Sequence, residues 1–159
     1  QHVLIFENEV NYKADEQRRD SAGDAALDCL VRAHERGDLV LAEPLAADDF
    51  VIMLKREFGV ECVQTNQLLR RPIKTVAICG GAGAFLLDDA VALGCDAFVT
   101  GEMHYHEFFG REQQIQIAVI GHYQSEQYTS EIFRDIIERD CPGVKCIIAE
   151  TCTNPIYYL

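Results

Sequence analysis

The sequence predicts an α/β protein with a mainly parallel sheet flanked by helices. From residue 74 onward, short and continuously apolar segments alternate with helical patterns, and glycine-rich turns separate them. Strands that are apolar throughout are typical of parallel sheets covered on both faces, because neither face of such a strand meets water. Binding sites in these sheets form just beyond the carboxyl ends of the strands.

The elements are expected in a regular order along the chain. The predicted strands are residues 75–79, 97–100, 117–120 and 144–149, and helices over 84–93 and 125–139 pack on their sheet. A helix over 48–58, with Asp48 as a possible N-cap, precedes them. A short strand over 2–6 and a helix over 22–36 are expected nearer the N-terminus, separated by a polar loop.

Charge and cysteine content limit the class of protein. The formal net charge of -12 argues against nonspecific binding to nucleic acid or to anionic membranes, since both depend on Lys and Arg. The seven cysteines are odd in number and form no C-x-x-C pair, which indicates reduced thiols and a cytoplasmic protein. No apolar run approaches the roughly 18 residues that a membrane-spanning helix needs.

A glycine-rich turn follows the first strand of the alternating region. Gly80, Gly81 and Gly83 would let the backbone approach a ligand closely and would present N–H groups to a phosphate. The turn matches neither the G-x-G-x-x-G nor the Walker pattern and contains no basic residue. A tight strand-to-helix turn is therefore an equal alternative to a phosphate-binding loop.

The next strand ends in Thr100, followed by Glu102 and a segment that contains His104 and His106. These side chains include groups that bind metals or transfer protons. A pair of histidines separated by one residue is common on protein surfaces, and alone it would indicate nothing more. Its position at a predicted strand end favours a functional role.

His122 leaves the third strand, and Glu126 follows four residues later at the start of a helix. This spacing places both side chains on one helical face, close enough to share an ion. An imidazole with a carboxylate suits Zn, Fe, Mn or Ni. The alternative is a glutamate stabilised by the helix dipole beside a hydrogen-bonded histidine.

Together, these segments resemble the NIF-three-like dinuclear-metal-centre family, also known as the GTP cyclohydrolase 1 type 2 homologs. The resemblance runs through KTVAICGGAGAFLLDDAVALGCDAFVTGEMHYHEFFG, IAVIGHYQSEQYTSEIFRDI and NPIYYL. With a looser match further upstream, it covers residues 38–159 and corresponds to the C-terminal portion of family members.

The resemblance implies two divalent metal ions per site in the full-length protein, with His122 and Glu126 as the C-terminal ligands. It places Thr100, Glu102 and His106 in the same cleft, and it implies a hexameric ring with its metal sites facing an internal cavity. The His-His-Pro motif of the family's N-terminal half does not occur here. Residues 1–37 are therefore expected to be the partly mobile tail of a preceding or inserted domain, and residues 38–159 the C-terminal metal-site domain.

Three functions follow as hypotheses. The first is a metal-dependent hydrolase that acts on a small molecule such as a nucleotide through a metal-activated water, with Glu102 and His106 transferring protons. The second is a noncatalytic, ring-forming or regulatory metal-binding protein. The third is a phosphate-binding domain that uses the glycine-rich turn. All three exclude a nucleic-acid or membrane partner, and the first two include homo-oligomerisation.

Overall fold

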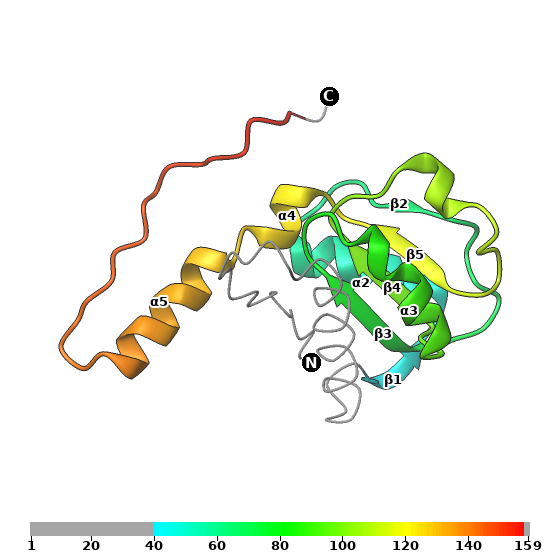
Figure 1. Ribbon diagram of the computed structural model, residues 1–159, viewed down its shortest axis with the longest axis horizontal. Helices are drawn as coiled ribbons and strands as arrows, with labels where there is room; N and C mark the ends of the chain where they lie inside the picture. The colour runs from blue at the N-terminus through cyan, green and yellow to red at the C-terminus, as the bar shows by residue number, and fades with distance from the viewer. Residues whose placement is uncertain (1–39, 158–159) are drawn as a thin grey trace, which may run out of the picture.

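The computed structural model describes residues 40–157, and the strands within that range form one mixed sheet (Figure 1). The strands are β1 (Val40–Leu45), β2 (Gln64–Thr65), β3 (Ile73–Cys79), β4 (Ala97–Thr100) and β5 (Gln116–Val119). Their order across the sheet is β1-β3-β4-β5-β2. The three central strands run parallel, and β1 and β2 pair antiparallel at the edges. The predicted fold class is confirmed.

The register between the central strands is regular over the whole length of β4. Ala97 lies opposite Gln116 of β5, and Thr100 lies opposite Val119. On its other side, β4 pairs with β3, where Thr100 lies opposite Cys79. The three parallel strands therefore end at the same edge of the sheet, as the sequence predicts for a site built from strand ends.

The helices of the described range are α2 (Ala47–Phe58), the 3-10 helix η1 (Ala84–Leu86), α3 (Leu87–Ala92), the 3-10 helix η2 (Tyr105–Phe108), α4 (His122–Glu126) and α5 (Thr129–Asp140). Two of them, α2 and α3, cover opposite faces of the sheet. Phe50 of α2 packs in one buried cluster with Val99, and Leu87 of α3 packs in another with Phe98. Because adjacent residues of β4 point to opposite faces, both faces are buried, which explains why the strand is apolar throughout. No helix in this range is long and apolar enough to cross a membrane.

Two helix boundaries differ from the predicted ones. The N-cap of α2 is Ala46, which makes no side-chain capping bond, so the assignment of Asp48 as the cap is wrong. Asp48 lies instead in the first turn, where a negative charge favours the positive end of the helix dipole. The helix expected over 84–93 is divided into η1 and α3. Edge strands β1 and β2 were not predicted, since β2 has only two residues and β1 contains Pro44.

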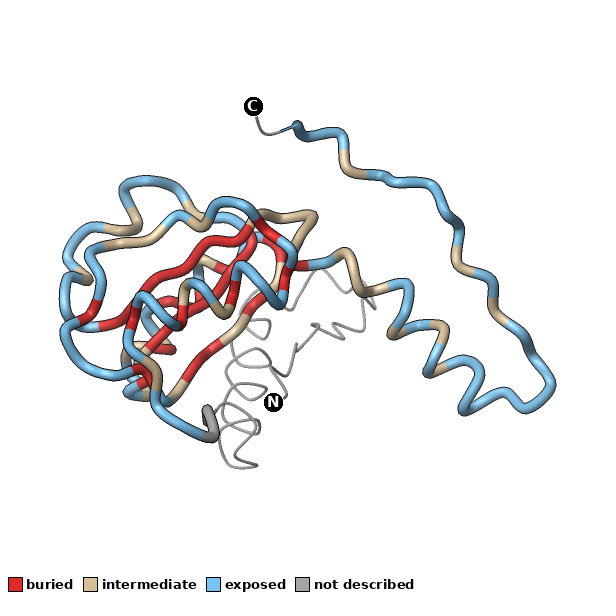
Figure 2. Tube along the Cα trace, turned by 180° about the vertical axis from the view of Figure 1, so that it is seen from behind, coloured by how far each residue is buried: buried red, intermediate tan, exposed pale blue. Residues whose placement is uncertain are grey.

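The C-terminal segment departs most from expectation. The helix expected over 125–139 begins earlier, is divided into α4 and α5, and does not pack on the sheet, because α5 contains no buried residue. Figure 2 shows α5 and the following tail as mainly exposed, extending beyond the sheet. The strand expected over 144–149 is wrong: within residues 40–157 this segment pairs with no strand, and Ile147 is 87% exposed. An extended segment becomes a strand only where a neighbour accepts its backbone hydrogen bonds.

Predictions for residues 1–37, including the strand over 2–6, the helix over 22–36 and the preceding-domain tail, lie outside the described residues.

Asp96 fastens the start of β4 to the start of β3. Its carboxylate accepts hydrogen bonds from the backbone N–H groups of Lys74 and Thr75, each at 2.9 Å, and from the Thr75 hydroxyl at 3.0 Å. It also pairs with the Arg71 guanidinium. The Asp96 N–H in turn donates to the Thr75 hydroxyl at 3.0 Å. This one carboxylate therefore helps set the register of the central strands.

We expect Asp96→Ala to lower the free energy of unfolding by about 2–4 kcal/mol, because it leaves two strand N–H groups, the Thr75 hydroxyl and the Arg71 guanidinium without their acceptor. Chemical denaturation followed by circular dichroism measures this change. Asp88→Ala is the matched control: Asp88 pairs with Arg111, but its side chain is 77% exposed, so about 0–1 kcal/mol is expected. Equal losses in the two variants would contradict the role assigned to Asp96.

Candidate functional site

The carbonyl group of Gly81 joins the glycine turn to the end of β4. The Gly81 oxygen accepts hydrogen bonds from the backbone N–H groups of Gly101 and Glu102, each at 2.9 Å. It also accepts one from the buried Thr100 hydroxyl at 3.1 Å. Gly81 has a φ of +64°, a conformation that glycine adopts without strain. Three donors on one carbonyl therefore fix the backbone that leads to Glu102.

Ser125 joins the same turn to the segment that follows β5. Its hydroxyl accepts a hydrogen bond from the Gly81 N–H at 2.9 Å and donates one to the His122 carbonyl at 2.7 Å. Ser125 is buried, and the sequence alone did not single it out. The available signal was its spacing: a small polar residue three positions after His122 lies on the same helical face.

These hydrogen bonds favour a structural role for the glycine turn. The Gly81 N–H is used by Ser125, and the Gly83 N–H donates to the Thr100 hydroxyl at 3.0 Å. Gly80 is half-buried, and a Cβ there would lie 3.6 Å from the Ser125 carbonyl oxygen. Two N–H groups that a phosphate would need thus already have partners within the protein.

His122 lies between two carboxylates. Its Nδ1 atom is 3.2 Å from Oε1 of Glu102, and its Nε2 atom is 3.3 Å from Oε2 of Glu126. Exposed side-chain fractions are 42% for His122, 58% for Glu102 and 50% for Glu126, so solvent reaches all three. The structure therefore brings together the two predicted ligands and one of the two predicted proton-transfer residues.

The chemistry of imidazole makes this arrangement informative. A neutral imidazole carries one N–H, so it can donate to only one of the two carboxylates. The lone pair of its other nitrogen then faces an acceptor oxygen, and this contact is favourable only with a proton or a cation between the two atoms. Because Glu102 and Glu126 approach opposite nitrogens, the three groups do not surround one point. Consistent with this, residues 40–157 contain no convergent group of three or more His, Cys, Asp or Glu side chains.

His106 and His104 occupy a different part of the site. The two rings stack with their centroids 5.5 Å apart, and His104 Nδ1 lies 3.4 Å from Oε2 of Glu107. His104 and Glu107 line the cleft described below, whereas His106 does not. Of the two predicted proton-transfer residues, Glu102 thus lies beside His122, whereas His106 does not.

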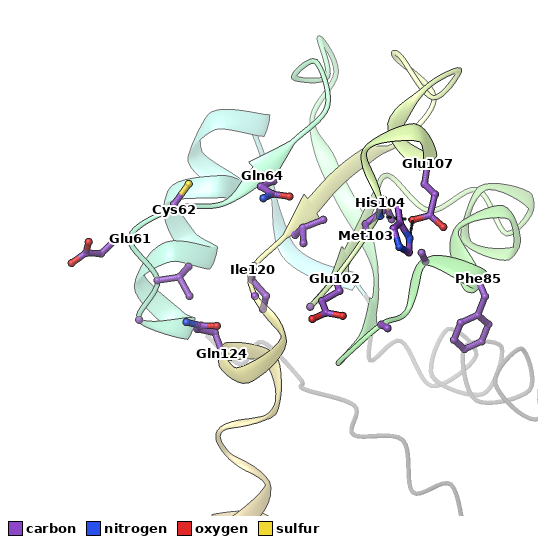
Figure 3. A pocket seen from close by; sticks show the side chains of 17 residues that line it. Glu61, Cys62, Gln64, Phe85, Glu102, Met103, His104, Glu107, Ile120 and Gln124 are labelled. Carbon is purple, nitrogen blue, oxygen red and sulfur yellow. Dashed lines mark hydrogen bonds and ion pairs between the residues drawn. The ribbon is translucent and has the colours of Figure 1, made fainter. Parts of the chain in front are cut away.

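A cleft of about 900 Å³ opens next to Glu102 (Figure 3). Its walls come from the loop after α2, the glycine turn, the segment after β4 and the end of β5. Figure 3 shows Glu102 and Ile120 near its centre, with Gln64 and Cys62 on one side and Met103 on the other. The sequence did not predict roles for Cys62, Gln64 or Met103, because no motif or strand-end position marks them.

Gly81 should not tolerate a side chain. A Cβ at this position would lie 2.6 Å from Oε1 of Glu126 and 3.4 Å from Nε2 of His122. We expect Gly81→Ala to lower the free energy of unfolding by about 1–3 kcal/mol, mainly from backbone strain, because the half-exposed Glu126 side chain can move away from the new Cβ at a small further cost. Thermal and chemical denaturation measure the loss.

Gly94→Ala separates the two causes. Gly94 has a φ of +73°, but a Cβ there would meet nothing within 4 Å. Backbone strain alone predicts a loss of about 1–2 kcal/mol. A loss in Gly94→Ala as large as that in Gly81→Ala would show that close packing against Glu126 contributes nothing.

The fold and the site define an α/β protein whose candidate functional residues gather at the carboxyl edge of a parallel sheet. Comparison with known sequences gives its family: the Duf34/NIF3 (NGG1p interacting factor 3) family matches residues 32–155. This match extends over most of the chain, and the chain belongs to that family.

Curated relatives carry the description GTP cyclohydrolase 1 type 2 homolog. One from Pseudomonas aeruginosa is 30% identical over 113 residues, which are 65% of this chain and 44% of that protein. Another, from Staphylococcus epidermidis, is 31% identical over 100 residues, which are 62% of this chain and 27% of that protein. The chain thus spans less than half of the length of these relatives.

Solved structures share the fold. Staphylococcus aureus protein SA1388 has a TM-score of 0.65 at 21% identity, covering 76% of this chain and 36% of that one. A Bacillus cereus protein related to NIF3 has a TM-score of 0.63 at 22% identity, covering 76% of this chain and 34% of that one.

Proposed function

We propose that the chain supplies part of a divalent-metal centre in a metal-dependent hydrolase that acts on a small molecule in the cytoplasm. His122 and Glu126 are the proposed ligands, and Zn, Fe, Mn or Ni are the ions that this pair suits. For the full-length protein we propose two ions per site, with the remaining ligands supplied by residues other than His122 and Glu126. The observation that carries the proposal is the position of His122 between two carboxylates.

The separation of the two proposed ligand atoms supports a shared ion. Nε2 of His122 and Oε2 of Glu126 are 3.3 Å apart. Two donors that each lie about 2.1 Å from one ion, at angles between about 90° and 110°, are separated by about 3.0–3.4 Å. The pair therefore needs little rearrangement to bind an ion. Two protein ligands are fewer than zinc or iron usually needs, so low affinity is expected for this chain alone.

Glu102 acts in the proposal as a positioning residue for His122. A carboxylate at Nδ1 favours the tautomer that carries its proton there and leaves the Nε2 lone pair for the ion. The backbone N–H of Glu102 is held by the Gly81 carbonyl, so the carboxylate starts from a fixed point. Removal of such a supporting carboxylate typically weakens metal binding by about 10–100-fold.

A bound divalent ion would supply Lewis-acid chemistry that lowers the pKa of its bound water toward about 7. Glu102, exposed beside the cleft, is the proposed acceptor of the proton that the attacking water loses. A proton-transfer role for His106 stays a prediction, as do cofactor contacts from Gly80, Gly81, Gly83 and Thr100. A nucleotide is one small-molecule substrate to test.

Metal titration tests this proposal. The chain is stripped with a chelator, and Zn²⁺ or Mn²⁺ is then titrated in competition with a chromophoric indicator. We expect one saturable site that His122→Ala and Glu126→Gln abolish, because each removes one of the two proposed ligands. Glu102→Gln keeps both ligands and should weaken binding by about 10–100-fold.

His104→Ala and Glu131→Gln are the controls, since both residues are exposed and neither contacts the proposed ligands. Unchanged affinity in Glu126→Gln, or the same loss in the controls, would rule out this metal site. Turnover that persists after every ion is removed would rule out the hydrolase while leaving metal binding intact.

The alternative is a noncatalytic, ring-forming metal-binding protein, and the exposed stripe on α5 favours association. Phe133 is 54% exposed and Ile137 is 40% exposed, although both are large and apolar. Burying such side chains against another protein surface stabilises an assembly. The ring proposed by analogy with the family is a hexamer.

Light scattering with Phe133→Ser as the variant tests association. The wild-type chain should give a mass above that of the monomer, and the variant should shift toward the monomer. A monomer at high concentration in both would contradict self-association of this chain.

A further inference from the structure

We propose that the cleft beside His122, with no ion bound, binds a planar nitrogen heterocycle in preference to a ligand that carries phosphate. The inference deepens the proposed function, because this cleft is where the substrate of the metal centre would lie. It is based on the charge of the lining, on two amide groups without protein partners and on the apolar side chains of the lining.

The lining carries no positive side chain. Of the described residues, those around the cleft include the carboxylates Glu61, Glu102 and Glu107, and none is Lys or Arg. Glu61 points away from the cleft in Figure 3, whereas Glu102 lies near its centre. With no ion bound, a phosphate chain placed here would lose hydration and meet only like charge, which costs free energy that no side chain of the lining offsets.

The glycine turn does not compensate for this missing charge. The N–H groups of Gly81 and Gly83 are used by Ser125 and Thr100, so they are not free to bind phosphate oxygens. Neither the side-chain charge of the lining nor the N–H groups of Gly81 and Gly83 therefore favour a phosphate.

Two glutamine amides line the cleft without partners. Across residues 40–157, neither the Gln64 nor the Gln124 side-chain amide makes a hydrogen bond to the protein, although other glutamines of the domain do, such as Gln116. A glutamine amide presents a donor and an acceptor side by side. This pattern matches a ring nitrogen next to an exocyclic amino or carbonyl group, as in the pairing of glutamine with adenine.

The apolar part of the lining suits a flat ring. Val60, Met103 and Ile120 line the cleft together with the central Glu102. An apolar lining with a few polar groups is typical of small-molecule sites, and a methionine adapts its shape to the ring that it covers. Glu102 can accept a hydrogen bond from an N–H of the ring, which a phosphate cannot offer.

Cys62 provides a direct probe of the cleft. It lines the cleft and is exposed, while Cys141, at the end of α5, is exposed away from it. Cys95 is buried, and burial raises the pKa of its thiol, so it should react slowly. The alkylation rate of each cysteine with iodoacetamide is measured by peptide mass spectrometry. Guanosine and adenosine are the neutral probes, and GTP and ATP are their charged counterparts.

We expect a nucleoside at millimolar concentration to slow the alkylation of Cys62 at least fivefold and to leave Cys141 unchanged. The matching triphosphate should slow Cys62 less than twofold. Equal or stronger protection by the triphosphate, or no protection by either nucleoside, would overturn the proposal.

Substitutions test the recognition itself. Gln64→Leu and Gln124→Leu remove the amides and should raise the nucleoside concentration for half-protection at least fivefold. Gln67→Leu is the control, since Gln67 is exposed and does not line the cleft. Gln64→Lys adds the missing positive charge and should gain protection by the triphosphate. If the leucine variants behave as wild type while the nucleosides still protect, the amides are not the recognition groups and the proposal is wrong.

All of these measurements are made in EDTA, and circular dichroism checks the fold of each variant. Protection of Cys62 without metal supports the cleft whether or not His122 and Glu126 bind an ion. Loss of metal binding with intact protection would refute the proposed function alone, and the reverse result would refute only this inference.

Discussion

The hydrogen bonds around Gly81 are the constraint on which the site depends. Its carbonyl holds the backbone of Gly101 and Glu102, and its N–H holds Ser125, which in turn binds the carbonyl of His122. One residue thereby connects the segments that follow three neighbouring strands. Glycine is favoured there because φ is positive, and a Cβ would also displace the Glu126 carboxylate from its place beside His122. The spatial relation of the side chains at this sheet edge follows from that junction.

Much of the central fold could be predicted because its signals are local. Residues 97–100 and 117–120 are short apolar runs between turns, and burial on both faces makes such runs apolar throughout. The proximity of His122 and Glu126 could be predicted for the same reason, since a spacing of four on a helix fixes their relative position. The convergence of Glu102 on the same imidazole followed from the general rule for strand ends, although its position at Nδ1 did not.

The parts that could not be predicted depend on distant partners. The segment over 144–149 has a strand-like sequence, yet no strand in the described part of the chain pairs with its backbone. The apolar stripe of α5 has helical spacing, but spacing does not say which surface covers it, and Phe133 stays exposed. Cys62 and Gln64 reach the cleft from the segment that leads into β2, which carries no strand-end signal. Their role depends on the approach of two segments far apart in the sequence.

The short central strands make the site sensitive to alignment. β4 has only four residues, and its pairing places Thr100 opposite both Cys79 and Val119. Side chains alternate between faces, so a slip of one residue would exchange Phe98 and Val99 between the two cores and turn the Thr100 hydroxyl away from the glycine turn. No strand register between the native one and this shifted one keeps some of the site residues in place while it displaces the others. Errors in strand pairing during folding would therefore yield molecules without the site rather than molecules with a weakened one.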